Sequence, residues 1–432
     1  MSAGAQGTVR DSFTGWLNPF DPSFQDNPYP TYHRIRELDP IHYLPEFNLW
    51  FLARYADVQS VLRDPRFSSE PTPDDPNLFR NLRESGGGLG PLAHTMLHWM
   101  PLKDPPHHTR LRNLVNKAFT PRHIEAMRPR IAAIVEQLLG RVLEAGRMDF
   151  VRDLAHPLPV IVIAEMLGVP VADQAELKQW SDDMALALDP LQVGARRAEG
   201  DRAVLAMRTL FERVAEERRR APRDDLLSSL LAVEELGDRL SMDELLATCV
   251  LLLFAGNETT TNLLGNGLLA LLRNPSELAL LEQDPSLIRG AVEELLRYDS
   301  PLQFAARVAK EDVEIDGRTL LPGQRAVLLL GSANHDPAQF PDPDRLDVRR
   351  SDHRHLAFGF GTHFCLGAGL ARAEAQTALD IVVRRLKGLR LGAEAPVRRP
   401  SIALRGLSSL PVEFEARSPH APKHGRADGP SL

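Results

Sequence analysis

Hydrophobic residues recur with a helical period along most of the chain. The pattern predicts helices over residues 29–38, 56–62, 107–119, 122–145, 158–167, 172–188, 196–219 and 286–298. Another helix is predicted to begin near Ser241, because Glu244 follows three positions later and the two residues form a capping-box pattern. This helix continues through a very apolar segment, so we expect it to be buried along most of its length. A last long helix is predicted at or just after Cys365.

Strand-like patterns are few and short. They cover residues 41–44 and 48–54, and then 313–320 and 325–330, where Asp316-Gly317 and Pro322-Gly323 are turn signals. Residues 65–104 and 334–354 are expected to be irregular, the first as a long mobile loop. The expected fold class is mainly α with a small β region. We expect a single domain over residues 16–416, between flexible ends at 1–15 and 417–432.

Composition narrows the class of protein. The 432 residues carry a formal net charge of −7 with 43% hydrophobic residues, and no basic tract suggests a nucleic-acid partner. The two cysteines, Cys249 and Cys365, exclude a disulfide framework and favour a reducing compartment. The N-terminus lacks the apolar core of a signal peptide, and the longest apolar run, residues 245–257, is shorter than the roughly 20 residues that span a bilayer. We therefore expect a cytoplasmic protein without a membrane anchor.

Cys365 stands alone in the stretch HLAFGFGTHFCLGAGLAR, among glycines and apolar residues. Three interpretations compete at this point. The thiol is a buried structural group, which is the commonest fate of a free cysteine, or a nucleophile whose pKa is lowered by a helix N-terminus. Alternatively it is a soft metal ligand, in a loop whose glycines let the backbone approach closely. Composition alone does not decide among them.

The spacing around this thiol resembles a known motif. Phe358, Gly361, His363, Cys365 and Gly367 match F-x-x-G-x-[HR]-x-C-x-G, the haem-ligand loop of the cytochrome P-450 family, the haem-thiolate monooxygenases. The resemblance covers residues 28–412 and implies the cytochrome P-450 fold, with haem buried between a long distal helix and the helix after the cysteine. It also implies heme b (iron protoporphyrin IX) as cofactor, with the thiolate as iron ligand, a donor that favours O–O cleavage.

The segment LLLFAGNETTTN places Glu258 and Thr259 in an otherwise apolar helix. Taken alone, they are explained if Glu258 reaches solvent and Thr259 bonds back to a carbonyl. The segment is also similar to the family's [AG]-G-x-[DE]-T motif on the distal helix, where the glycine leaves room for dioxygen. That resemblance implies that Thr259 is the distal hydrogen-bond group and Glu258 its proton relay, in a reaction that uses dioxygen and electrons.

The two propionates of a buried haem need cationic partners. The stretch DPPHHTRLR resembles the family's D-P-P-x-H-x-R-x-R helix start, which implies that His108 and Arg112 bind a propionate. Arg307 and His363 match the other two propionate positions. Cys365 is the metal ligand. The cofactor-binding residues that the resemblance implies are His108, Arg112, Ala255, Gly256, Thr259, Arg307, Phe358, Gly359, His363 and Gly367.

Other charges are expected to serve folding or docking. Glu294 and Arg297 share one helical face, and with Arg345 they match a family triad that supports the haem loop. No flavin or iron–sulfur segment accompanies the haem body, so electrons are expected from a separate ferredoxin and its NAD(P)H-dependent ferredoxin reductase. A basic patch on the cysteine side would suit such an acidic partner. The residues expected to form it are Arg110, Arg112, Lys117 and Arg372.

The expected activity is insertion of one oxygen atom of dioxygen into a hydrophobic small-molecule substrate, by hydroxylation or epoxidation, in a monomeric enzyme. Macrolide, terpenoid, steroid and fatty-acid skeletons are all compatible with the apolar segments expected to contact it, which are 86–100, 185–193, 251–255, 302–304 and 406–407. Three alternatives stay open: another outcome such as carbon–carbon coupling, a haem-binding sensor or carrier without turnover, and a cysteine-nucleophile enzyme. The Glu258-Thr259 pair argues against a carrier, and no His–Cys pair oriented by Asp or Asn is evident.

Overall fold

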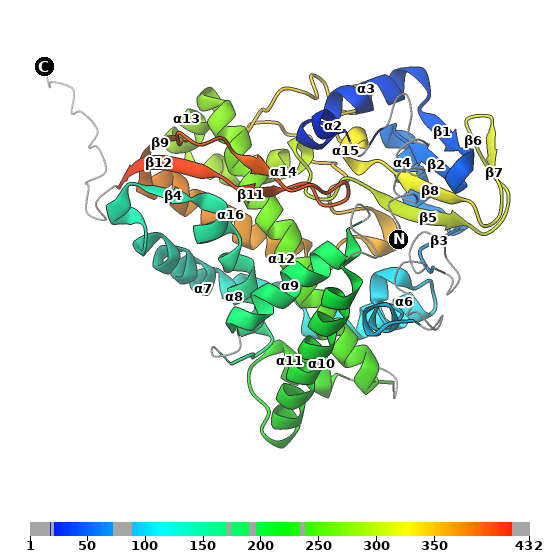
Figure 1. Cartoon of the computed structure of the whole chain (residues 1–432), viewed down its shortest axis with the longest axis horizontal. Helices are drawn as coiled ribbons and strands as arrows, with labels where there is room; N and C mark the ends of the chain where they lie inside the picture. The colour runs from blue at the N-terminus through cyan, green and yellow to red at the C-terminus, as the bar shows by residue number, and fades with distance from the viewer. Residues whose placement is uncertain are drawn as a thin grey trace, which may run out of the picture.

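The computed structural model of the chain describes residues 18, 21–71, 89–170, 174–189, 196–233 and 238–416. The predicted flexible ends, 1–15 and 417–432, lie outside these ranges. Helices make up most of the described chain (Figure 1). Their bounds are α2 Pro22–Asp26, α3 Tyr29–Leu38, α4 Tyr55–Arg63, α5 Pro91–Met96, α6 His107–Ala118, α7 Pro121–Gly140, α8 Pro157–Met166, α9 Gln174–Leu188, α10 Arg197–Arg220, α11 Leu226–Ala232, α12 Met242–Arg273, α13 Pro275–Gln283, α14 Ile288–Tyr298, α15 Leu330–Ala333 and α16 Ala368–Arg385.

Local hydrogen bonds explain where these helices begin and end. The Ser241 hydroxyl accepts from the Glu244 backbone N–H at 3.2 Å, and the Glu244 carboxylate accepts from the Ser241 N–H at 2.9 Å, which confirms the predicted capping box of α12. Most predicted bounds differ from the observed ones by a few residues. Helix α7 ends at Gly140, and the expected extension to 145 instead holds a 3-10 turn at Leu143–Ala145.

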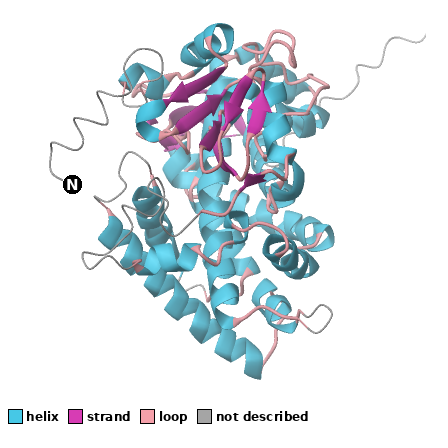
Figure 2. Cartoon of the chain, turned by 90° about the vertical axis from the view of Figure 1, so that its right-hand side faces the viewer, coloured by secondary structure: helices cyan, strands magenta, loops and turns pink. Residues whose placement is uncertain are grey.

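The strands lie in the upper half of the molecule in Figure 2, and helices occupy the lower half. The largest sheet has the order β1-β2-β8-β5-β3, in which the β2–β8 pair is parallel and the other pairs are antiparallel. The four predicted strand regions are confirmed as β1, β2, the β6–β7 hairpin and β8. The bounds are β1 Ile41–Leu44, β2 Leu49–Leu52, β3 Phe67–Ser68, β4 Arg147–Asp149, β5 Ala305–Ala309, β6 Val313–Ile315, β7 Arg318–Leu320, β8 Arg325–Leu328, β9 Leu386–Leu391, β10 Val397–Arg398, β11 Leu407–Ser409 and β12 Pro411–Ala416.

The prediction for one irregular region is wrong, and one short strand was not predicted. Residues 65–104 are not irregular throughout, because β3 and α5 lie in the described parts of this region. Strand β4 lies between the predicted helices 122–145 and 158–167 and pairs with β12 in the sheet β4-β12-β9. This strand has three residues, and its partner comes from the other end of the chain. Its formation therefore depends on tertiary contacts rather than on a local pattern.

Helix α12 runs through the middle of the molecule (Figure 1). Helices α8, α9, α10, α14 and α16 pack against it, and most of its side chains are buried, as predicted. The burial is interrupted at residues 254–256 and at Thr259. The fold is mainly α with a small β region. Of the helices in the described ranges, none combines the length and the apolarity needed to cross a membrane.

Candidate functional site

The loop that carries Cys365 is folded tightly onto the N-terminal part of the chain. Gly359 and Gly361 have positive φ angles, of 69° and 72°, which residues with a side chain disfavour. A Cβ atom on Gly361 would lie 2.9 Å from a backbone carbonyl oxygen of α4, so a larger residue would push the loop away. The Cys365 N–H donates to the Phe358 carbonyl at 2.9 Å. This bond closes the loop just before α16 begins.

The Cys365 sulfur lies deep in the protein although the residue has accessible surface. Burial raises the pKa of the Cys365 thiol. The backbone N–H of Gly367 and the charges of Arg112 and Arg372 act in the opposite direction. Backbone donors and cations therefore lie near the sulfur, as a thiolate ligand requires. By contrast, burial alone raises the pKa of the Cys249 thiol to about 12, which fits a structural cysteine.

Four side chains expected to hold the haem propionates come together from three parts of the chain. His108 lies in α6 and His363 in the cysteine loop, and their ring centroids are 4.1 Å apart. Burial lowers the pKa of His108, and so do the charges of Arg112 and Arg307. Burial, followed by the charges of His108, Arg307 and Arg112, lowers the pKa of His363 to about 3. The two imidazoles are therefore neutral at pH 7, while the two arginines carry the positive charge.

This cluster is short of negative charge. Burial lowers the pKa of Arg307 to about 10, and its guanidinium donates to the Ala306 carbonyl at 2.8 Å rather than to an acid. Both ring nitrogens of His108 are buried and have no partner among the described residues. The charge of Asp104 reaches the cluster, but its carboxylate already accepts from the Ser68 hydroxyl at 2.5 Å. Buried cations are costly without anions, so the residues present fit a group that carries two carboxylates, as haem does.

The motif residues of α12 take up two different environments. The Thr259 hydroxyl donates to the Ala255 carbonyl at 2.8 Å, as its local interpretation expects. Glu258 does not reach solvent, because it is 2% exposed and accepts from the Arg399 guanidinium at 2.6 Å. Ala255 has an exposed surface in a buried helix, and beyond its own helix no described atom lies within 4 Å of a Cβ built on Gly256. Small residues thus open one face of α12 to an interior space.

Sequence reasoning missed the side chains that surround Glu258. His156, just before α8, has its Nε2 atom 2.9 Å from Oδ1 of Asp182, in α9. These two residues and Glu258 present ligand atoms that lie within 4.8 Å of one another. Arg399, from the segment between β10 and β11, completes the group. The four residues come from four segments and belong to no common motif, so only the tertiary structure identifies them.

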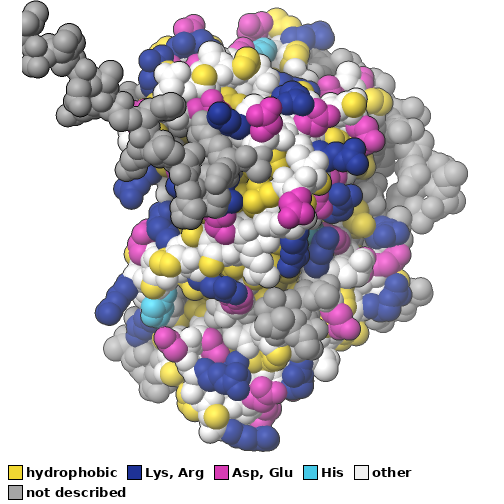
Figure 3. Space-filling view, turned by 90° about the vertical axis from the view of Figure 1, so that its left-hand side faces the viewer, with side chains coloured by type: hydrophobic (Ala, Val, Ile, Leu, Met, Phe, Trp, Pro, Cys, Tyr) yellow, Lys and Arg dark blue, Asp and Glu magenta, His cyan; other side chains and the backbone are white. Residues whose placement is uncertain are grey.

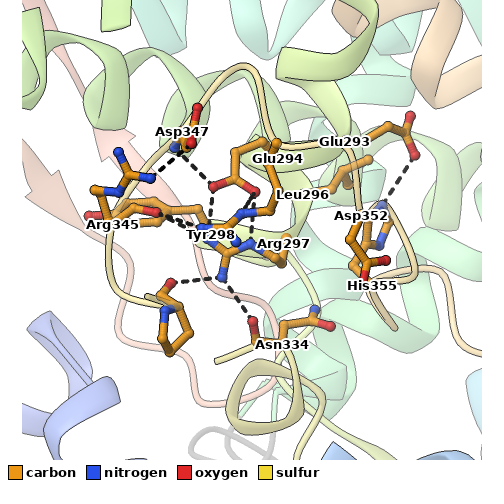
Figure 4. A network of polar contacts seen from close by, with 12 residues as sticks. Glu293, Glu294, Leu296, Arg297, Tyr298, Asn334, Arg345, Asp347, Asp352 and His355 are labelled. Atoms are coloured by element: carbon orange, nitrogen blue, oxygen red, sulfur yellow. Dashed lines mark hydrogen bonds and ion pairs between the residues drawn. The ribbon is translucent and has the colours of Figure 1, made fainter. Parts of the chain in front are cut away.

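Glu294 and Arg297 of α14 form the predicted ion pair, which Figure 4 shows from close by. Arg345 is predicted as the third member of this triad, and that prediction is wrong, because the Arg345 guanidinium bonds to Asp347 at 3.0 Å. The third guanidinium is that of Arg350, whose Nε donates to Glu294 at 3.1 Å. Arg345 contributes its backbone carbonyl, which accepts from Arg297 at 3.4 Å. The path of the irregular segment decides which arginine points inward, and the sequence does not encode that path locally.

The predicted basic patch is wrong in two of its members. Arg110 is paired with Asp238 and Glu244, and Arg372 donates two hydrogen bonds of 2.7 Å to Glu293. Paired charges are common on the surface. On the face shown in Figure 3, basic and acidic side chains are interspersed. The pairing of Arg110 and Arg372 with acids reduces the net positive charge of the predicted basic patch.

The segments expected to contact the substrate are described only in part, because 86–88 and 190–193 lie outside the described ranges. Trp99 is buried and stacks on Phe254 of α12, with ring centroids 5.9 Å apart. His98 lines a surface pocket together with Lys103. Trp99 and His98 are neighbours in the sequence, but the indole lies in the core and the imidazole lines a surface pocket.

The chain matches known proteins over most of its length. A family model described as Cytochrome P450 matches residues 94–390. The chain is 42% identical to Vitamin D(3) 25-hydroxylase of Pseudonocardia autotrophica, over 92% of this chain and 96% of that protein. It is 40% identical to 6-deoxyerythronolide B hydroxylase of Saccharopolyspora erythraea, over 91% of this chain and 97% of that protein. The solved structure of P450BioI, in complex with acyl carrier protein ligated to hexadec-9Z-enoic acid, matches at a TM-score of 0.84 with 38% identity, over 91% of this chain and 99% of that one.

Proposed function

This chain belongs to the cytochrome P450 family, and from that premise we propose which of its residues carry the reaction. The protein is a haem-dependent monooxygenase with the fold of this family. We assign Cys365 as the iron ligand and Glu258 with Thr259 as the proton-delivering pair. The observation that carries the assignment is the cysteine loop, where backbone donors and the charges of Arg112 and Arg372 act on the Cys365 sulfur.

Heme b fits the residues around this loop. The cluster of His108, Arg112, Arg307 and His363 would hold its propionates, and the support is that these side chains are buried together without a matching acid. When bound, haem supplies the centre at which dioxygen is reduced and cleaved, so that one oxygen atom enters the substrate and the other leaves as water. Each turnover consumes one dioxygen, two electrons and two protons.

Other residues of the proposed cofactor set shape the surroundings of that group. Gly367 lies beside the sulfur, since a Cβ on it would be 3.9 Å from Sγ of Cys365. The ring of Phe358 is covered by the Arg372 guanidinium, 4.6 Å from its centroid. Gly359 allows the turn of the loop through its positive φ. Together these contacts would shield the thiolate from water, which keeps its donor strength constant.

Glu258 and Thr259 supply the protons in this proposal. The Thr259 hydroxyl lies on the face of α12 that borders the interior, and its oxygen can accept a hydrogen bond while its proton points to Ala255. Glu258, next in the chain, is an acid in a buried position, and burial raises its pKa. A proton held on Glu258 can therefore move through the Thr259 hydroxyl towards the oxygen that is being cleaved.

Redox partners supply the electrons, and we propose that the direct donor is a small ferredoxin reduced by an NAD(P)H-dependent reductase. Exposed basic residues next to the cysteine loop support this proposal. The Arg63 guanidinium lies over the ring of Phe360, 4.2 Å from its centroid. Arg122 is exposed at the start of α7, where Ile124 packs on the first turn of α16. Phe364, 38% exposed in the cysteine loop itself, adds an apolar side chain to this surface.

The proposed substrate is a hydrophobic small molecule of natural-product type, and the outcome is hydroxylation or epoxidation. Support comes from relatives whose names refer to vitamin D(3) and 6-deoxyerythronolide B, and from P450BioI, which binds a fatty acid ligated to a carrier protein. The stacked pair Trp99 and Phe254 lies where an apolar ligand would meet α12. We also propose a single cytoplasmic domain over residues 16–416, supported by the 91% of the chain that P450BioI matches and by two unpaired cysteines. The monomeric state stays a prediction.

Carbon monoxide tests the cysteine assignment. The reduced protein is expected to give the strongly red-shifted Soret band of a thiolate-ligated carbonyl. Cys365→Ser should lose this band and the oxygen insertion into substrate. Cys249→Ala is the matched control, because that thiol is buried in α12 and has no assigned role. A red-shifted band that persists in Cys365→Ser, or a preparation without haem, would contradict the assignment.

A further inference from the structure

The side chains around Glu258 form a group of two acids, an imidazole and a guanidinium. Oε2 of Glu258 accepts from Arg399 at 2.6 Å, while Oε1 is buried and has no hydrogen-bond partner among the described residues. Asp182 and His156, bonded to each other at 2.9 Å, lie within 4.8 Å of a carboxylate oxygen of Glu258. Two carboxyls held so close together repel each other unless a proton lies between them.

Among the members of this group that can take up a proton, Asp182 is the one most exposed to solvent. The Asp182 side chain is 31% exposed, whereas the side chains of His156 and Glu258 are 4% and 2% exposed. Asp182 belongs to α9, which packs against α12, so its carboxyl stands between water and the buried acid. A proton from water therefore meets Asp182 before it meets Glu258.

The two carboxyls differ in their affinity for that proton. Burial raises the pKa of Glu258, and the nearby Asp182 raises it further, against the charges of Arg399 and His156. Burial also acts to raise the pKa of Asp182, but the hydrogen bond and charge of His156 outweigh it, with help from Arg399 and Lys178, so the pKa is lowered. A proton that enters the pair therefore moves from Asp182 to Glu258. This is the direction that delivery to the interior requires.

The same ligand atoms are near enough together for a metal ion, but their surroundings disfavour one. The Arg399 guanidinium already bonds to Glu258, and it would repel a divalent cation placed beside that carboxylate. His156 Nε2 faces the Asp182 carboxylate, to which it donates its proton. A proton is therefore the positive charge that this group is built to hold.

Given the proposed role of Glu258 in proton delivery, we propose that Asp182 is the residue that transfers protons from solvent to Glu258 after each delivery. Asp182 takes a proton from water, passes it to Glu258 and returns to its carboxylate form. His156 is a positioning residue, which orients Asp182 and keeps it ionised. No bond other than those to the moving proton forms or breaks in this step.

Asp182→Asn tests the proposal because it removes the titrating carboxyl but keeps its shape. Asp183→Asn is the matched control, since its carboxylate on the same helix accepts from Gln179 at 3.1 Å. Each holoenzyme is first checked for the thiolate–carbonyl band, which shows an intact haem site. Asp182→Asn is expected to slow turnover roughly ten- to hundredfold, within the contribution of a positioned proton donor, and to increase the H2O/D2O rate ratio. Asp182→Glu, which keeps a carboxyl at this position, should turn over at most of the rate of the unmodified protein. Asp183→Asn should turn over at the same rate as the unmodified protein.

An infrared measurement on the resting protein does not depend on turnover. The C=O stretch of protonated Glu258 is identified by its loss in Glu258→Gln. Its pH midpoint is expected to fall in Asp182→Asn, because a neighbouring negative charge is removed, and to stay in place in Asp183→Asn. The proposal is overturned if both asparagine variants give the same rate, isotope ratio and midpoint. Stoichiometric Zn²⁺ binding that His156→Gln abolishes would also overturn it. In either case, uncoupled turnover in Thr259→Ala and the carbonyl band would still support the proposed function.

Discussion

Glu294 and Arg297, one turn apart on α14, form two hydrogen bonds of 2.7 and 2.8 Å while both side chains are almost fully buried. The Arg297 guanidinium also donates to the carbonyls of Asn334 and Pro343, and Glu294 accepts from Arg350. A buried ion pair is tolerated when its remaining donors and acceptors are satisfied in this way. The pair thereby ties α14 to the irregular segment that leads into the cysteine loop (Figure 4).

Arg297→Met is expected to lower the free energy of unfolding by about 3–5 kcal/mol, because it leaves the Glu294 carboxylate buried without its main partner. Arg345→Met is the matched control, since that guanidinium bonds to Asp347 near the surface, and the expected change is below about 1 kcal/mol. Urea unfolding followed by circular dichroism measures both variants. Equal losses would show that the buried pair adds nothing to the fold.

Glu293 predicts a specific dependence of stability on acid pH. Burial acts to raise the pKa of Glu293, but hydrogen bonds from His355 and Arg372 outweigh it and lower the pKa to about 2. The ionised form is thus favoured in the folded state, and its stabilisation is present above the unfolded value of 4.5 and lost as pH falls towards 2. Glu293→Gln should cost about 3 kcal/mol at neutral pH and almost nothing near pH 2. Urea titrations of both proteins from pH 2 to 6 test this, and a difference that does not change with pH would contradict it.

Arg307→Gln is expected to stabilise the haem-free chain but to weaken haem binding. It removes a largely buried charge that bonds to a carbonyl and to no acid among the described residues, so the haem-free chain should become more stable. It also removes a charge-assisted partner of the proposed propionate, so haem should leave about ten to a hundred times faster. Unfolding of the haem-free protein and haem transfer to an acceptor protein measure the two effects. Arg318→Gln, an exposed arginine paired with Asp39, is the control and should change neither.

Thr259→Ala is expected to keep the helix and haem binding but to divert electrons into hydrogen peroxide. Alanine is a better helix former than threonine, so the loss concerns only the hydroxyl. Product formed per NADH should fall and peroxide should rise, because protons no longer reach the oxygen in time. Thr209→Ala is the matched control: its hydroxyl makes the same back-bond, to the Leu205 carbonyl at 2.9 Å, on α10. Unchanged coupling in Thr259→Ala would refute the role of this hydroxyl.

Reversing charge beside the cysteine loop tests the proposed ferredoxin surface. Arg122→Glu is expected to raise the KM for ferredoxin about fivefold at low salt, because reversing one surface charge costs roughly 1 kcal/mol of binding free energy. The effect should shrink as salt is added. The carbonyl spectrum should not change. Arg141→Glu is the control, because this exposed arginine lies at the other end of α7, about 30 Å away. Equal changes in both variants would place the docking surface elsewhere.

Much of this site follows from short-range patterns. The spacing around Cys365 identified the loop, and the run through Glu258 and Thr259 identified the distal helix, because each motif lies within a dozen residues. The capping box at Ser241 and the β6–β7 hairpin are equally local. The interactions that create such elements join residues a few positions apart, so one sequence is enough to predict them.

The wrong predictions about ion pairs concern partners that are distant in the chain. The sequence proposed Arg345 for the buried pair, and the structure has Arg350 there. It counted Arg372 as a free surface charge, but Glu293 neutralises it. Whether an arginine points inward depends on the path of an irregular segment, and that path is determined by what packs against it.

By itself, then, the sequence determined the family, the haem-thiolate chemistry and the helices that carry it. The tertiary structure alone decided that Glu258 is buried, that Arg399 bonds to it, and that Asp182 and His156 stand between it and water. The physical reason is the range of the forces. Helical periodicity and loop conformation arise from neighbours along the chain, whereas the burial and proton affinity of an acid depend on side chains that only folding brings near.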